Sequence, residues 1–340
     1  NREMLMNIKQ SVPSTVGTQS AAVNLGEMNS WGWELSVNWR DKIGKDFKYR
    51  IGLNTGYRDN EVLVMDWVTG NSLYRQITKG HRTDMGLWGM QCIGMFRSFQ
   101  DINEYFDMYM KKEDGSYGTY MGMTKEQVRP GMLIYKDVRG ALQENGTYAG
   151  PDHNVDEELD QVQLSNRTNP YGFTINAGAE WKGISLTAQF GASWGGYTVV
   201  PSAALKPNGS LEYCNMPSFW NPDNMFVYQD IYDGSGNLLM EANRDAQYPN
   251  LAYSNVNAVT SSFWRVSAAR VALNRLTLAY TIPSSLYKKF GVNNIRVNVT
   301  GQNVLNFYNP YPDKFMNPMA GSYGSYPNLR KWTVGVNLSF

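Results

Sequence analysis

Several segments of the chain alternate strictly between apolar and polar residues over about ten positions. In 171–181, aromatic and aliphatic residues take every second position, and Gly, Thr, Asn and Glu fill the others. A Lys182-Gly183 pair follows, and 184–194 repeats the pattern in the opposite phase. Alternation with a period of two is typical of a β-strand with one apolar and one polar face. The same pattern recurs in 31–39, 47–57, 276–282, 295–302 and 331–340.

The aromatic residues of these segments stand at the segment ends, and aliphatic residues fill the middles. The end positions are Trp31, Trp39, Phe47, Tyr57, Tyr171, Trp181, Trp194, Trp332 and Phe340. A β-sandwich would also alternate, but its strands are usually only about five or six residues long. Two aromatic girdles around an aliphatic band are typical of a barrel wall in lipid, and small polar residues suit a wet interior. The sequence therefore predicts an all-β protein, a transmembrane antiparallel β-barrel.

The connections between these segments differ in length. Short ones lie at 41–46, 182–183 and 283–291, and long ones at 10–30, 59–170, 196–265 and 306–327. Outer-membrane barrels have short periplasmic turns and longer extracellular loops. If 1–9 is the first of eight passes, every long connection, including 59–170 and 196–265, falls outside the cell and the carboxyl terminus is periplasmic.

Composition and charge exclude several classes of protein. The chain has 31 basic and 30 acidic residues, so no basic field points to nucleic acid. It has no apolar run of about twenty residues, which a transmembrane helix would need. Its first ten residues lack the pattern of a signal peptide and are expected to lie within a strand. Cys92 and Cys214 are expected to be free, partly buried thiols, with one disulfide as the alternative.

The residue types that carry catalysis form no recognisable site. His81 and His153 have no partner at metal-ligand spacing, and the acidic residues of 152–160 lack the regular spacing of a calcium loop. This acidic run is expected to be a solvated loop face. No nucleophile elbow, phosphate loop or dinucleotide fingerprint is present. We expect no enzyme activity, no catalytic residue, no metal site and no cofactor, with calcium as the weaker alternative.

One loop has a composition suited to binding. It contains Phe219, Trp220, Phe226, Tyr228 and Tyr232 among Asn and Asp residues. Aromatic rings and amide or carboxylate groups suit a sugar, and Tyr and Trp are also enriched in protein interfaces. These five residues are predicted to contact a protein partner or a ligand, and plain packing within the loop is the alternative.

Several stretches resemble the carboxyl-terminal part of the SusC/RagA family, the TonB-dependent outer-membrane transporters of Bacteroidetes. They are NSWGWELSVNW, GMFRSFQDINEY, RPGMLIYKDVRG, the run from Arg270 to Asn306, and YPNLRKWTVGVNLSF. The resemblance implies a 22-stranded barrel with an amino-terminal plug, of which residues 1–340 would supply about eight carboxyl-terminal strands. The plug, the TonB box and the earlier strands have no counterpart here and are expected in another chain or an untraced segment. Of the family's run after its PGD segment, the chain keeps Asp137.

The resemblance also implies a function. It is TonB-dependent import of oligosaccharides or oligopeptides across the outer membrane, with a SusD-like lipoprotein as a lid and TonB contacting the plug. The alternating Trp332, Val334, Val336, Leu338 and Phe340 resemble the signal by which the barrel-assembly machinery recognises its clients. Two alternatives are a small eight-stranded outer-membrane barrel or anchor protein and a soluble carbohydrate-binding β protein.

Overall fold

The structure is a computed structural model. It describes residues 2–9, 22–65, 73–75, 79–206, 216–287, 289, 291–320, 322–326 and 328–340. Cys214 and parts of the predicted connections 10–30, 59–170 and 196–265 lie outside the described residues.

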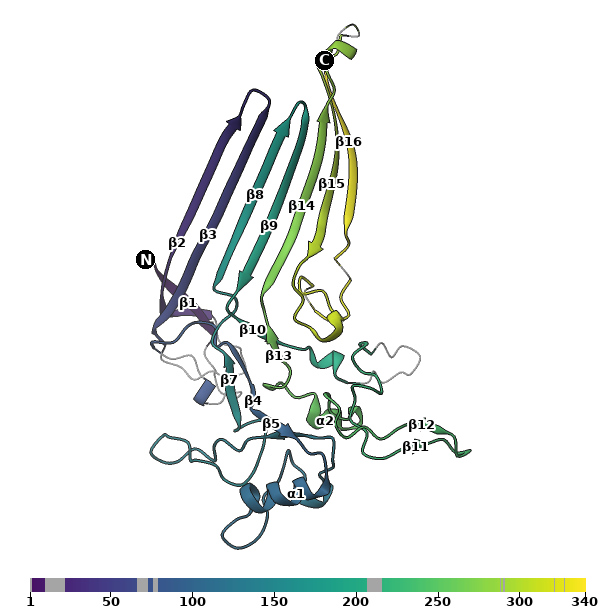
Figure 1. Cartoon of the computed structure of the whole chain (residues 1–340). Helices are drawn as coiled ribbons and strands as arrows, with labels where there is room; N and C mark the ends of the chain where they lie inside the picture. The colour runs from purple at the N-terminus through teal and green to yellow at the C-terminus, as the bar shows by residue number, and fades with distance from the viewer. Residues whose placement is uncertain are drawn as a thin grey trace.

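Eight strands form one antiparallel sheet in the order β1-β2-β3-β8-β9-β14-β15-β16. Their bounds are β1 Arg2–Lys9, β2 Ala22–Ile43, β3 Phe47–Val64, β8 Tyr171–Trp181, β9 Ile184–Trp194, β14 Arg270–Thr281, β15 Asn294–Asn306 and β16 Lys331–Ser339. In Figure 1 the long strands stand side by side as a tilted wall. β1 and β16 are the two edge strands and do not pair with each other. The predicted antiparallel wall is confirmed, and the alternative of a closed eight-stranded barrel is wrong.

The alternation located β8 and β9 to the residue but missed the first halves of two other strands. β2 begins at Ala22 rather than near 31, and β14 begins at Arg270 rather than 276. In β2 the pairing register shifts between Glu27 and Met28, and in β14 it shifts between Leu273 and Arg275. A β-bulge inserts one residue and reverses which face the following residues occupy. A search for unbroken alternation therefore stops at the bulge.

The long connections build a second part of the molecule, which we call the lobe, at the end of the wall opposite the short turns (Figure 1). Its strands pair in twos: β4 with β7, β5 with β6, β10 with β13 and β11 with β12. Their bounds are β4 Leu87–Met90, β5 Cys92–Met95, β6 Leu133–Tyr135, β7 Gln161–Ser165, β10 Tyr197–Val199, β11 Ile231–Tyr232, β12 Leu238–Met240 and β13 Arg265–Ser267.

The helices are short. The α-helices are α1 Phe99–Tyr105 and α2 Ser254–Asn257, and a π-helical turn, Phe106–Met110, extends α1. Six 3-10 turns lie at Leu73–Arg75, Lys125–Gln127, Ser202–Ala204, Leu251–Tyr253, Ser284–Leu286 and Pro312–Lys314. Ser98 and Asp101 form a capping box that fixes the start of α1. Within the described ranges, no helix has the length and apolarity to cross a membrane.

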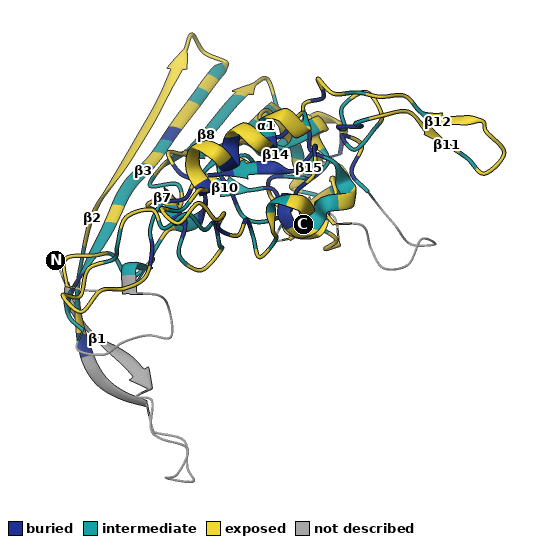
Figure 2. Ribbon diagram, turned by 90° about the horizontal axis from the view of Figure 1, so that it is seen from below, coloured by how far each residue is buried: buried dark blue, intermediate teal, exposed yellow. Residues whose placement is uncertain are grey.

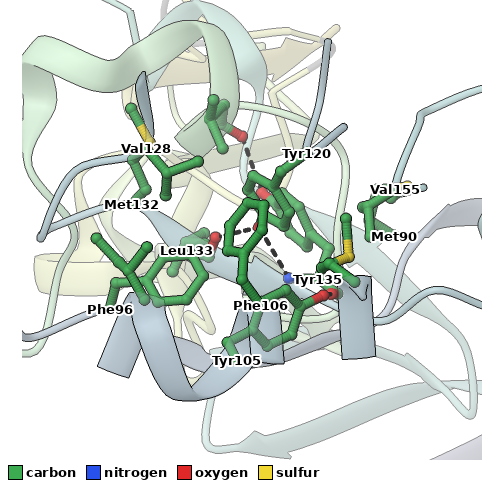
Figure 3. Packing of buried hydrophobic residues seen from close by; sticks show 13 residues of the cluster. Met90, Phe96, Tyr105, Phe106, Tyr120, Val128, Met132, Leu133, Tyr135 and Val155 are labelled. Carbon is green, nitrogen blue, oxygen red and sulfur yellow. Dashed lines mark hydrogen bonds between the residues drawn. The ribbon is translucent and has the colours of Figure 1, made fainter. Parts of the chain in front are cut away.

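The lobe contains the main hydrophobic cores of the chain. The first core gathers Phe96, Phe106, Tyr120, Leu133 and Tyr135, all fully buried, with α1 beside them (Figure 3). Tyr120 donates its hydroxyl hydrogen to the Leu133 carbonyl, and the same oxygen accepts from the Tyr135 amide at 3.0 Å. The second core gathers Val200, Leu205, Phe219, Tyr248 and Trp264. These cores stabilise the lobe independently of the sheet.

Candidate functional site

One face of the sheet is apolar and exposed. In β2, Trp33, Leu35, Val37 and Trp39 are between 48% and 59% exposed, and in β16 Val334, Val336 and Leu338 are between 54% and 71% exposed. Soluble monomers rarely expose an apolar surface that continues over many strands. Aromatic residues at the strand ends with aliphatic residues between them match the two interfaces and the middle of a bilayer. This face is suited to lipid.

The opposite face of the sheet is polar, and it is the first candidate for contact with a ligand or a partner. The Ser36 hydroxyl donates to Asn54 Oδ1 at 2.7 Å, and Gln189 Nε2 donates to Asn176 Oδ1 at 3.1 Å. Arg296 donates to the Ser185 hydroxyl at 2.7 Å. Two hollows of about 350 and 580 Å³ lie along this face. Volumes in this range are common for ligand sites.

The structure does not gather the five predicted contact residues into one site. Phe219 and Phe226 are fully buried. The Phe219 ring packs 4.9 Å from Tyr248 and 6.3 Å from Trp264, centroid to centroid. A Cβ built on Gly131 would lie 2.6 Å from the Phe226 ring, so Phe226 fills the space that this glycine leaves. For Phe219 and Phe226 the packing alternative describes the structure, and the expectation of surface contact is corrected.

The other three predicted residues lie in different surroundings. Trp220 is half-buried and donates its indole hydrogen to the Ala204 carbonyl at 2.9 Å. The Arg244 guanidinium lies 4.4 Å from the centre of the Tyr228 ring. Tyr232 is 56% exposed. Among the five, Tyr228 and Tyr232 are the ones that reach the surface with a ring free of the second core.

Tyr232 belongs to a hairpin that projects from the lobe (Figure 2). The hairpin pairs β11 with β12, and its Ile231, Leu238 and Leu239 are 44%, 46% and 63% exposed. Asp233 fixes the turn by accepting hydrogen bonds at 2.8 Å from the Ser235 and Asn237 amides. An ordered turn that presents exposed apolar residues is suited to a protein partner. The apolar pattern of 238–240 gave no such signal in the sequence.

A charged cluster ties the wall to the lobe. Near the end of β3, the Asp59 carboxylate accepts from Arg167 Nη1 at 2.9 Å and from the Tyr57 hydroxyl at 2.7 Å, and it also pairs with Arg82. Its side chain is only 14% exposed. Arg82 and Arg167 lie far from Asp59 in the sequence, so sequence spacing could not reveal this cluster.

Replacing Asp59 by Asn is expected to loosen the junction between the wall and the lobe. The substitution removes the negative charge but leaves two guanidinium groups facing each other, and a charged hydrogen bond contributes about 1.5–3 kcal/mol. Limited proteolysis should cut the junction segments 79–86 and 165–170 several times faster in the variant. Lys182→Gln, at an exposed turn, is the control. Equal cleavage rates in the three proteins would contradict this role of Asp59.

The acidic residues of the lobe serve as hydrogen-bond acceptors for the backbone. The buried Asp160 accepts from the amides of Val138 at 2.7 Å and Asp156 at 2.9 Å. Asp137 accepts from the His153 amide at 2.7 Å. The expectation of a solvated face is therefore wrong for Asp160, because its carboxylate organises the loop from within. In the described part of the chain, no three His, Cys, Asp or Glu residues are grouped to hold a metal ion.

The stability of the lobe is expected to fall as pH rises from about 4 through 6. Burial raises the pKa of Asp137 from 3.8 to about 6, and the Asp160 carboxylate adds to this rise. Between these values the folded lobe binds more protons than the unfolded chain, so the stabilisation is full below pH 4 and is lost above 6. Asp137→Asn should flatten this part of the curve of melting temperature against pH. A variant that keeps the full slope would show that Asp137 is not its source.

Cys92 is a free, half-buried thiol, as the sequence predicts. Burial raises its pKa to about 11, so it stays protonated at neutral pH. A thiol of this kind is a poor nucleophile.

Comparisons with known proteins extend over almost the whole chain. No family model matches the sequence. It is 24% identical over 97% of its length to TonB-dependent receptor P3 of Formosa agariphila, and 20% identical over 99% to TonB-dependent receptor P39 of the same organism. The chain covers 30% and 33% of these two relatives, so it spans about a third of their length.

Solved structures show the same fold. The chain superimposes on the RagAB peptide importer in the open-open state with a TM-score of 0.62, at 19% identity and over 99% of its length. The RagAB peptide transporter matches with a TM-score of 0.62, at 18% identity. The chain covers 31% and 32% of those two chains. The open sheet is thus part of a larger barrel.

Proposed function

We propose that this chain, which belongs to the TonB-dependent receptors, forms a section of the wall of an outer-membrane importer for oligosaccharides or oligopeptides. The observation that carries the proposal is the open sheet with one exposed apolar face and one polar face. The apolar face contacts lipid, and the polar face lines the interior through which the nutrient passes. A soluble carbohydrate-binding protein would have no use for an apolar face of this extent.

The lobe gives the proposal a direction. Short turns at one end of the wall and a large lobe at the other match the periplasmic and extracellular sides of outer-membrane barrels. The segments 59–170 and 196–265 then lie outside the cell, and the carboxyl terminus lies at the periplasm. The exposed hairpin of β11 and β12, with Tyr232, and the nearby Tyr228 contact a SusD-like lipoprotein lid. TonB acts through a part of the receptor outside these residues.

Uptake by living cells tests this function. A strain that lacks the receptor gene is compared with its parent for uptake of fluorescent oligosaccharides and oligopeptides, before and after loss of TonB. We expect uptake of at least one of these substrate classes to fall to background in both mutants and to return when the gene is restored. Uptake that persists without the receptor, or that does not depend on TonB, would overturn the proposal.

Orientation is tested separately with protease added to intact cells. Cleavage is expected within 59–170 or 196–265 once the lid lipoprotein is removed. Cleavage only after the outer membrane is broken would reverse the proposed orientation.

We also propose that Trp332, Val334, Val336, Leu338 and Phe340 form the signal for barrel assembly. Phe340 is 80% exposed, so its truncation removes little buried area, about 2 kcal/mol at most. Phe340→Ala is expected to lower the amount of receptor in the outer membrane several-fold while uptake per inserted molecule stays unchanged. Immunoblots of membrane fractions and uptake assays measure the two quantities. Normal abundance with failed uptake would assign Phe340 to transport instead.

A further inference from the structure

A group of cations lies on the polar face of the wall near its short turns. We call Arg40, Lys42, Lys48, Arg50 and Arg275 the cationic patch. They line the two hollows of this face, together with Arg296, and the acidic residues that line the same hollows are Asp41 and Glu180. The patch therefore carries a local excess of positive charge in a chain whose net charge is only +1.

Two of these arginines face each other directly. Arg40 of β2 and Arg50 of β3 are partners in the strand register, so their side chains leave the same face at adjacent positions. Like charges directly opposite each other on a sheet are destabilising. Within the described residues, the guanidinium groups of Arg40, Arg50 and Arg275 have no hydrogen-bond or ion-pair partner. The charge of the patch is thus uncompensated by the wall itself.

The backbone beneath the patch leaves room for the arginine side chains. A Cβ built on Gly178 of β8 would lie 2.7 Å from Arg50 Nε, so the Arg50 side chain lies across this glycine. Gly178 is paired with Thr187 of β9, which lines both hollows. From β2 to β14 the patch crosses four strand spacings, about 19 Å. A surface this wide is larger than one carboxylate needs and matches a face of folded polypeptide.

We propose that the cationic patch binds an acidic surface, rich in Asp and Glu carboxylates, of the receptor's own polypeptide outside residues 1–340. The proposal rests on the function given above. Relatives are about three times as long as this chain, so the receptor has further polypeptide to place against the polar face. Arginine pairs with carboxylates through two parallel hydrogen bonds, and such pairs are stronger than neutral ones. The position of the patch near the short turns, far from the lobe, favours an internal segment over a ligand that enters through the lobe.

Photo-crosslinking in the full-length receptor tests this assignment. The photoreactive residue p-benzoylphenylalanine replaces Thr187 at the centre of the patch, and cells that express the receptor are irradiated. We expect a crosslink within the receptor to a peptide that contains Asp or Glu, identified by mass spectrometry. The double variant Arg50→Gln with Arg275→Gln should lower the crosslink yield several-fold. Lys182→Gln, which removes a cation at the exposed turn, should leave it unchanged.

Other outcomes would overturn the assignment. They are a crosslink to a peptide without acidic residues, a crosslink to a different protein or to a small anionic ligand, and a yield that ignores the arginine substitutions. If the double variant does not reach the membrane, the crosslink of the otherwise unchanged receptor is measured in detergent at about 0.1 and 1 M salt. Screening should lower the yield at the higher concentration, and a constant yield would contradict the proposal. Because membrane insertion is measured by immunoblot, its failure counts against the proposed function and not against the patch.

Discussion

Replacing Ile175 by Arg is expected to lower the amount of receptor in the outer membrane several-fold. Ile175 lies near the middle of β8, halfway between the aromatic residues Tyr171 and Trp181. It pairs with Leu53 of β3 and Phe190 of β9 on the apolar face. An arginine at the midplane of the lipid-facing side of a barrel costs about 2–4 kcal/mol. Quantitative immunoblots of outer-membrane fractions measure the effect.

Thr174 provides the matched control, because it is the neighbour of Ile175 and faces the other side of the sheet. It pairs with Asn54 and Gly191 on the polar face. Thr174→Arg introduces the same side chain into the wet interior and should leave the amount of inserted receptor close to normal. If the two variants assemble equally well, our assignment of the lipid-facing side is wrong.

Replacing Asn257 by Ala is expected to destabilise the lobe by about 3 kcal/mol and to leave the wall intact. Asn257 is 2% exposed and lies where the two cores of the lobe meet. Its Oδ1 accepts from the Leu133 amide at 2.8 Å, and its Nδ2 donates to the carbonyls of Gly131 at 2.9 Å and Asn250 at 2.8 Å. Alanine leaves the buried Leu133 amide without an acceptor, and each such orphaned group costs about 1–3 kcal/mol.

Hydrogen exchange separates this local effect from general unfolding. In Asn257→Ala, the amides of 131–135 should exchange at least tenfold faster, and those of β8 and β9 should keep their rates. Asn237→Ala is the control, because Asn237 makes its hydrogen bonds in the exposed turn of the β11 and β12 hairpin. Surface substitutions of this kind usually change stability by less than about 0.5 kcal/mol. Unchanged exchange at Leu133 would contradict the bridging role of Asn257.

The period-two pattern was sufficient to predict the wall. Each strand residue faces either lipid or the interior, so the sequence of a strand such as β8 records both environments directly. The two aromatic ends of 171–181 also recorded where the wall meets the membrane surfaces. The pattern lost the strands only at the bulges near Glu27 and Asn274, where an extra residue reverses the phase. The resemblance in the run from Arg270 to Asn306 added the family, which alternation alone does not specify.

The lobe was decided by tertiary structure. Its aromatic residues look alike in the sequence, yet the fold buries Phe219 and Phe226 completely and leaves Tyr232 at the surface. Burial there depends on contacts between segments that are far apart, such as Phe219 with Phe315, and no local period encodes them. The pairing of Asp59 with Arg82 and Arg167 and the facing of Arg40 and Arg50 likewise exist only once the strands are in register. In a sheet that meets lipid, one-dimensional order reports the environment of each residue, whereas in an irregular lobe that environment is created by the folding of the whole chain.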